Sequence, residues 1–283
     1  MPTLYRPDQN RLLAALEPAE SARLAPHLEL LRLLPGDVLY QSGGKLMYVY
    51  FPITAVVSIQ YELENGGSCE IASVGHGGLL GVSLFMGGRT TPSRAVVQND
   101  GYAYRLSAAR LVEEFHRRGP LFGLLLRYTQ VLMTEMAQTA VCNAHHSTQQ
   151  RLCRWLLQML DHTHSSEVAI TQEALGAILG VRREGITEAA GRLQMTGLIS
   201  YRRGHVRVLS RTGLEAMVCE CHRALRRESD RLMAPRHRAD AGIQQRWLER
   251  EAVHTRRTGR PERRGDGAHD AEAGDSQADL QFP

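Results

Sequence analysis

The stretch 172–193 constrains the fold of this chain more than any other part of the sequence. Thr171 is a favourable N-cap, so a helix is predicted to begin at Gln172. Gly180 permits a tight turn after that helix, and Gly176 leaves room for a second helix to approach closely. The apolar positions expected to face inward are Leu175, Ile178, Leu179, Val181, Ile186, Ala189, Ala190 and Leu193. The pattern therefore predicts two packed helices joined by a tight turn.

Polar residues occupy the outward positions at the start of the second predicted helix. They are Arg182, Arg183, Glu184, Thr187 and Glu188. Such a helix N-terminus suits the major groove of DNA, because arginine binds guanine O6 and N7 together and glutamate accepts from cytosine N4. A plain buried helix hairpin is the alternative. This alternative is disfavoured because the small residues, the glycines and the apolar residues all stand at the positions that a DNA-binding helix-turn-helix requires.

Two β-forming runs, 198–201 and 206–209, predict a hairpin directly after these helices. Its tip holds Arg202 and Arg203 beside Gly204, where arginines can contact DNA phosphates. Residues 182–211 contain seven arginines and two glutamates, a local charge of +5 in a chain whose total is +4. The basic character is therefore concentrated on the predicted reading region.

Short β-forming runs separated by glycine and proline fill residues 30–106. They are 37–40, 47–51, 55–61, 70–74 and 94–98. Regularly spaced short strands with such turn signals predict a barrel or sandwich. The preceding segment, 10–34, is predicted to be weakly helical.

A long helix is predicted after Gly119 and Pro120, since proline is tolerated in a first helical turn. Near-heptad spacing links Leu121, Leu125, Tyr128, Leu132, Met136 and Thr139. A core helix packed on the barrel is one interpretation. Further apolar residues outside this stripe favour two partner surfaces, the barrel and a second subunit, and the stripe is assigned to the dimer.

The chain has five cysteines: Cys69, Cys142, Cys153, Cys219 and Cys221. An odd, scattered set is not a disulfide framework. Cys219, Cys221 and His222 resemble half a metal site, but one residue separates the thiols where zinc sites usually have two to four. No second half follows at a fitting distance, so no metal site is predicted.

Other signals exclude several classes of protein. The N-terminus has no basic region leading into an apolar one, and no run approaches 18 uncharged apolar residues, so a cytoplasmic protein without a membrane span is predicted. The sequence also lacks a phosphate-cradling glycine loop and a nucleophile elbow, and no enzymatic activity is predicted.

The order of barrel, long helix and winged helix-turn-helix resembles the Crp/Fnr family, that of cyclic-AMP receptor protein and the fumarate-nitrate regulator. The matching motifs are 34–44, 50–58, 142–157 and 170–173. The resemblance implies an α+β protein, and the chain is predicted to have four parts. Three of these follow from the resemblance, which covers about residues 10–222: a jelly-roll-like β-roll sensor domain (10–118), a dimerisation helix (119–146) and a winged helix-turn-helix DNA-binding domain (147–222). The fourth, residues 223–283, alternates arginine with acidic residues and has few large apolar ones, which predicts a charged, largely disordered tail with one loose helix near 243–253.

The resemblance also implies site residues. Arg183 and Glu184 match the family's base-reading pair, and Thr171 and Gln172 belong to its helix opening. Glu188 stands where some members read with another arginine, which alters the expected DNA site. The family acts as a dimer on an imperfect palindrome of double-stranded DNA.

The effector pocket of the family is expected at Gly81, Val82, Ser83, Ser93 and Arg94. Members that bind cyclic nucleotides have a ribose-binding Glu where this chain has Val82, and a phosphate-binding Arg where it has Pro92. Without an arginine at this position, the negative charge of a buried phosphate has no guanidinium to compensate it, so cyclic-AMP binding is not expected. Because no cysteine precedes Cys69, no iron–sulfur cluster is expected, and no cofactor is assigned.

The sequence thus predicts a homodimeric, sequence-specific DNA-binding transcriptional regulator, with RNA polymerase as a further partner. The alternative is a cyclic-nucleotide-type sensor module that acts on a protein partner. The predicted exposed cluster of Arg182, Arg183 and Glu184 favours the regulator, because a module that binds only protein needs no such helix.

Overall fold

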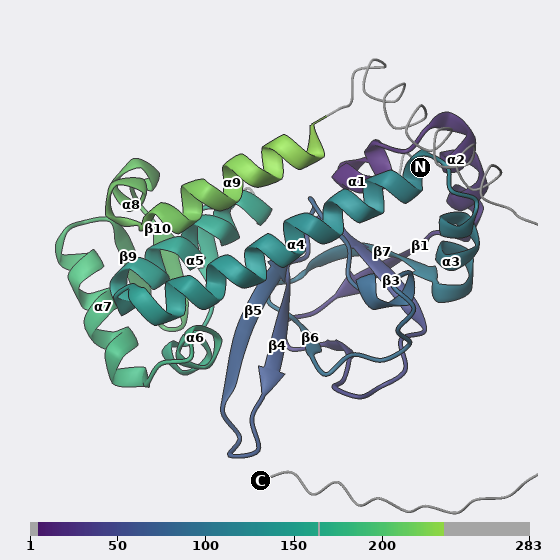
Figure 1. Cartoon of the computed structure of the whole chain (residues 1–283). Coiled ribbons are helices and arrows are strands. Elements are labelled where there is room, and N and C mark those ends of the chain that lie inside the picture. The colour runs from purple at the N-terminus through teal and green to yellow at the C-terminus, as the bar shows by residue number, and fades with distance from the viewer. Residues whose placement is uncertain (1–4, 164, 235–283) are drawn as a thin grey trace, which may run out of the picture. The chain divides into compact units, whose positions relative to one another are not determined.

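The structure, a computed structural model, describes residues 5–163 and 165–234 (Figure 1). Two antiparallel sheets form its β-roll. One sheet has the order β1 (Glu29–Leu33), β7 (Gly101–Ser107), β3 (Tyr48–Pro52), and the other the order β2 (Val38–Tyr40), β6 (Arg94–Val97), β4 (Val57–Glu62), β5 (Ser68–Val74). Apolar residues of both sheets, among them Val57 and Ala103, pack in one buried cluster.

The five predicted β-forming runs correspond to β2 to β6, whereas β1 and β7 were not predicted. The helical lead-in 10–34 is correct only in its first part, where α1 (Arg11–Ala14) and α2 (Pro18–Leu24) lie. The prediction was wrong for Glu29–Leu33, which pairs antiparallel with β7. Its leucines, glutamate and arginine have high helix propensity, and the pairing with a distant strand overrides that preference.

Helices α3 (Ala108–His116) and α4 (Pro120–His145) follow the sheets, and Pro120 lies in the first turn of α4 as expected. The stripe assigned to the dimer faces inward instead. Leu121, Leu125 and Tyr128 are buried in the core of the β-roll, and the Tyr128 hydroxyl donates to the carbonyl of Leu79 at 2.9 Å. Leu132, Met136 and Thr139 continue on this inner side. The assignment is corrected because spacing identifies an apolar stripe but not the surface that covers it.

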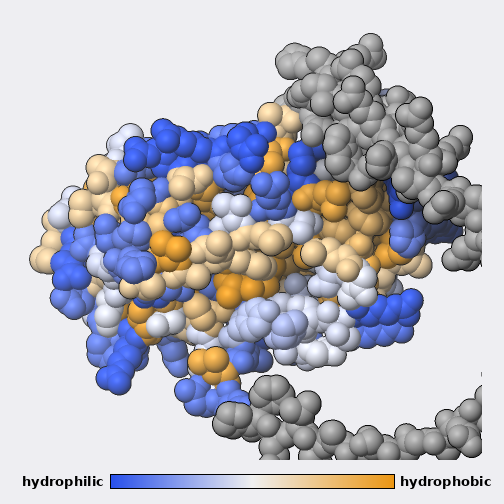
Figure 2. Space-filling model, viewed as in Figure 1, coloured by the Kyte–Doolittle hydropathy of each residue, from blue (hydrophilic) through white to orange (hydrophobic). Residues whose placement is uncertain are grey.

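A different side of α4 is exposed, and we call it the outer face. Its residues are Leu126, Gln130, Met133, Ala137, Ala140 and Ala144. They recur at intervals of four and three residues, as in a coiled-coil seam. Leu126 is 44% and Met133 61% exposed, and Figure 2 shows apolar surface gathering over α4 on this face.

The C-terminal part of the described chain is a winged helix-turn-helix. Its elements are α5 (Thr148–Thr163), β8 (Glu167–Ala169), α6 (Gln172–Leu179), α7 (Arg183–Met195), β9 (Ile199–Arg202), β10 (His205–Val208) and α8 (Arg211–Met217). The strands form a sheet of order β8–β10–β9, so the predicted hairpin has a third strand that the sequence analysis missed. Trp155 of α5 is 1% exposed and belongs to the core beneath α6 and α7.

Helix α9 (Glu220–Met233) lies beside α4 (Figure 1). The predicted tail boundary at residue 223 is therefore wrong, because α9 continues through it. Leu225 and Leu232 are buried, and Arg127 of α4 donates from Nε to the carbonyl of Leu232 at 3.0 Å. The helix predicted near 243–253 lies outside the described residues. In the described ranges, no helix combines the length and hydropathy needed to cross a bilayer.

Two buried carboxyl groups lie where β5, α4 and α5 meet. The hydroxyl of Ser58 donates to Glu70, and Glu135 accepts from the amide of Ser73 at 2.9 Å. Burial raises the pKa of Glu70 to about 8 and the pKa of Glu135 to about 7, and the nearby Arg154 guanidinium opposes both shifts. Glu70 is therefore protonated at neutral pH.

The stability of the protein is expected to fall as the pH rises from about 4.5 to about 8. An unfolded glutamate loses its proton near pH 4.5, whereas folded Glu70 holds it to about pH 8, so the folded state binds the extra proton in this window. Glu70→Gln cannot ionise. From pH 5 to pH 8 its free energy of unfolding should gain about 2–4 kcal/mol relative to wild type, measured by urea denaturation. Glu64→Gln, at the exposed tip of the same hairpin, is the control. The prediction would be contradicted if the difference in free energy of unfolding between Glu70→Gln and the wild type did not change with pH.

Candidate nucleic-acid interface

The helix pair α6 and α7 is held by the features that predicted it. The hydroxyl of Thr171 accepts from the amide of Ala174 at 3.1 Å and caps α6. Gly180 ends α6 in the left-handed region, with φ 60° and ψ 40°. A Cβ on Gly176 would lie 2.9 Å from the carbonyl oxygen of Val181, so only glycine permits this close approach of the turn. The predicted helix-turn-helix is confirmed.

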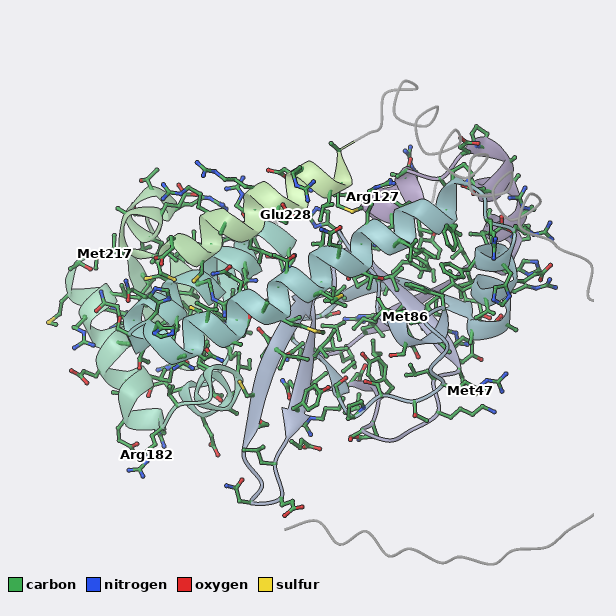
Figure 3. The ribbon with its side chains drawn as sticks, in the orientation of Figure 1. Met47, Met86, Arg127, Arg182, Met217 and Glu228 are labelled. Carbon is green, nitrogen blue, oxygen red and sulfur yellow. The ribbon has the colours of Figure 1, made fainter. Side chains whose placement is uncertain are left out.

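The inner and outer sides of the pair also follow the prediction. The residues buried between the helices and the domain core are Leu175, Ile178, Leu179, Ile186, Ala189, Ala190 and Leu193. The residues predicted to read DNA from α7 are all exposed: Arg182, Arg183, Glu184, Thr187 and Glu188. Arg182, the N-cap of α7, extends away from the helix pair in Figure 3.

A hollow of about 320 Å³ brings several predicted residues together. Thr171 and Gln172 of α6, Arg183 of α7 and Arg203 of the wing line it. The Thr187 hydroxyl donates to Oε1 of Gln172 at 2.8 Å and so joins the start of α6 to α7. Residues separated by up to 32 positions in sequence thus form one surface.

The wing ends in a tight turn that exposes its arginines. Arg202 pairs with His205 across the hairpin, and the two residues between them have positive φ, 49° at Arg203 and 77° at Gly204. Two such residues are typical of a hairpin turn that matches the twist of its strands. Arg203 therefore lies at the tip and is exposed.

The arginines of this region fall into two groups. Three are held by carboxylates: Arg192 by Glu188 at 2.6 Å, Arg207 by Glu167 at 3.5 Å, and Arg211 by Asp161 at 2.5 Å. Among the described residues, no carboxylate pairs with the other four, Arg182, Arg183, Arg202 and Arg203. Arg183 and Arg203 line the hollow, and all four are exposed, so their charge is available to an anionic ligand. Glu188, predicted to read bases, is the partner of Arg192.

The residues predicted as an effector pocket lie in the β-roll. Gly81 has φ 101° and precedes a short 3₁₀ turn, and Val82 packs against the apolar core. Ser93 is buried, with its hydroxyl 2.9 Å from that of Thr91. Arg94 forms an ion pair with Glu62 at 2.5 Å, so its positive charge is already compensated.

A cavity of about 480 Å³ lies elsewhere, between β5, α4, α5 and α9. Asp161, His222 and Arg211 contribute to its wall. Burial would raise the pKa of Asp161, but hydrogen bonds from His222 and Arg211 bring it down to about 2. This cavity was not predicted from the sequence, because its walls come from segments that are far apart in the chain.

Two family models match the sequence. The cyclic nucleotide-binding domain matches residues 30–118, and the Crp-like helix-turn-helix domain matches residues 150–217. Together the two models cover more than half of the chain. Comparison with curated proteins gives no match.

Several solved structures are similar. A crp/fnr-family chain from Eubacterium rectale is 16% identical, with a TM-score of 0.59, and the match covers 74% of this chain and 98% of that one. FixK2 from Bradyrhizobium japonicum is 16% identical, with a TM-score of 0.58 and coverage of 68% and 98%. The c-di-GMP responsive global regulator CLP from Xanthomonas campestris is 19% identical, with a TM-score of 0.54 and coverage of 69% and 100%. At sequence identities this low, the structural similarity shows a shared fold and nothing more.

The two family models occur in the order of β-roll and helix-turn-helix that the structure displays. The exposed arginines that pair with no carboxylate of the described chain lie on the helix-turn-helix and its wing. On these grounds the chain belongs to the Crp/Fnr family of DNA-binding transcriptional regulators.

Proposed function

We propose that the protein acts in the cytoplasm as a homodimer that binds an imperfect palindrome in double-stranded DNA and regulates transcription there, with RNA polymerase as a further partner. The observation that carries the proposal is the group of four exposed arginines, at the start of α7 and on the wing, that have no carboxylate partner within residues 5–163 and 165–234. A cluster of unpaired guanidinium groups on an exposed helix start matches the needs of base reading and phosphate binding.

The outer face of α4 supports the homodimer. Its interval of four and three residues suits a second copy of the same helix, and alanines at 137, 140 and 144 let two backbones approach closely. Exposed Leu126 and Met133 would supply the larger contacts. A two-fold axis through this face relates two copies of α7 and so accounts for a palindromic site.

On DNA, the start of α7 would enter the major groove of each half-site, with Arg183 reaching guanine and Glu184 reaching cytosine. The wing arginines, Arg202 and Arg203, would contact phosphates. Half-sites about one helical turn apart follow from this arrangement.

The β-roll is proposed to respond to something other than cyclic AMP. Val82 packs in the core where a ribose would need an acceptor. The guanidinium of Arg94, the nearest candidate for a cyclic phosphate, is bound to Glu62 and to Gln60. A phosphate in this place would have to displace an existing ion pair.

The salt dependence of DNA binding tests the proposal. Selection from a random DNA pool should yield a site with dyad symmetry, and its log affinity should fall linearly with log salt concentration. Because a dimer carries two wings, Arg203→Ala should reduce the slope by about 2. Arg207→Ala removes a wing arginine that is already paired with Glu167, and is expected to leave the slope nearly unchanged. A wild-type protein that selects no site would favour the sensor module acting on a protein partner.

A further inference from the structure

Four side chains with metal-binding atoms converge where α4 ends and α9 begins. Cys142 lies in the last turn of α4, and His146 is its C-cap. Cys219 is the N-cap of α9, and Cys221 lies in its first turn. Their three sulfur atoms and one ring nitrogen all lie within 4.8 Å of one another. No second pair of metal ligands follows Cys221 in the sequence, but the fold brings Cys142 and His146, about 75 residues earlier, to Cys219 and Cys221.

Two of the separations match those expected around a single tetrahedral ion. A Zn²⁺ ion with bonds of about 2.3 Å to sulfur and about 2.0 Å to nitrogen places two sulfurs about 3.8 Å apart, and sulfur and nitrogen about 3.5 Å apart. The observed separations are 3.7 Å between the sulfurs of Cys142 and Cys219, and 3.5 Å between the Cys221 sulfur and Nδ1 of His146. An iron–sulfur cluster needs a wider arrangement of ligands.

The local chain geometry explains why the atoms converge. Cys142 and His146 are four residues apart, which places both on one side of the helix end. Cys219 and Cys221 lie at the N-terminus of α9, where the helix dipole favours negatively charged thiolates. Cys142 and Cys221 are fully buried and Cys219 is 4% exposed. The arrangement is closed, as in structural zinc sites.

Neighbouring polar groups suit the ligands as well. Nε2 of His146 lies 3.4 Å from Oε1 of Glu220, which directs the other nitrogen, Nδ1, toward the sulfurs. A carboxylate that orients a histidine in this way is a common feature of zinc sites. The side-chain amide of Gln138 donates to the Cys221 sulfur at 3.1 Å.

From this geometry we infer that Cys142, His146, Cys219 and Cys221 bind one Zn²⁺ ion per chain in a closed site. The ion joins the end of the long helix to the helix that follows the winged helix-turn-helix domain. The inference is independent of the DNA site and of the homodimer.

Cobalt titration of the full-length protein tests the inference. Reduced protein, freed of metal by a chelator, should bind one Co²⁺ per chain with the absorption bands of a tetrahedral thiolate complex, and Zn²⁺ should abolish those bands. A wild-type chain that gives no tetrahedral cobalt spectrum, or that contains a Cys142–Cys219 disulfide and takes up no metal after reduction, overturns the inference. This part of the test needs no variant and holds even if the variants fold poorly.

Variants identify the ligands. Cys142→Ser and Cys221→Ser should each lower the thiolate-to-cobalt absorption by about a third and weaken binding at least 10-fold. Cys153→Ser changes a buried cysteine outside the cluster and should retain the spectrum. Glu220→Gln should weaken Co²⁺ about 10-fold while the tetrahedral bands remain. Equal losses in Cys153→Ser and Cys221→Ser, with folding checked by circular dichroism, overturn the assignment.

Discussion

Arg183→Ala is expected to weaken binding to the selected DNA site by about 30-fold or more, while binding to unrelated DNA changes little. A bidentate contact between arginine and guanine discriminates by about 1–3 kcal/mol, and the proposed dimer makes the contact twice. Arg183 is exposed and lines the hollow beside the wing, so its loss removes a reading group without disturbing the core. Fluorescence anisotropy with specific and scrambled duplexes measures both affinities.

Arg192→Ala is the matched control for this experiment. It removes the same charge from the same helix, but Arg192 is bound to Glu188 at 2.6 Å and to Gln149 at 2.9 Å. Its effect on sequence preference should be small. An Arg183→Ala protein that keeps the full preference would show that bases are read elsewhere.

Met133→Asp is expected to convert the dimer to monomers and to abolish tight binding to the palindrome. Each dimer would bury two carboxylates near the two-fold axis, and an uncompensated buried charge costs about 3–5 kcal/mol. The dissociation constant of the dimer should therefore rise at least 100-fold, as measured by sedimentation equilibrium. Met133 is 61% exposed in the single chain, so the monomer should remain folded.

Met86→Asp provides the comparison, since Met86 is 60% exposed but lies on the β-roll and is not part of the outer face of α4 (Figure 3). It should remain dimeric. A dimeric Met133→Asp protein would assign the interface to another surface. Leu125→Asp cannot serve in this test, because Leu125 is fully buried in the fold of its own chain.

The helix-turn-helix was predictable because its determinants are local. Gly176 is required because the carbonyl of Val181, five residues later, leaves no room for a side chain, and Gly180 is required because the turn there is left-handed. Both requirements arise within a few residues of the glycine itself. The apolar positions of α6 and α7 pack against one another, so a single window of sequence contains both halves of the pattern. The exposed side could then be assigned by elimination.

Features that depend on distant partners were missed. Strand β1 has the composition of a helix, and only β7, some 70 residues away, makes it a strand. The inward stripe of α4 has the spacing of a coiled coil, but the β-roll occupies it. Cys219 and Cys221 looked like half a site because Cys142 is 77 positions away. In each case the local pattern was visible in the sequence, but the distant partner that determines its role was not.

The position of the four ligands on either side of the winged helix-turn-helix has a thermodynamic consequence. One ion bonded to both Cys142 and Cys219 closes a loop of 77 positions that contains the whole DNA-reading unit. Closing a loop of this length removes conformational entropy from the unfolded chain worth about 4 kcal/mol. Much of the benefit therefore arises in the unfolded ensemble. The fraction of the regulator that is folded would then depend on the concentration of available metal in the cell.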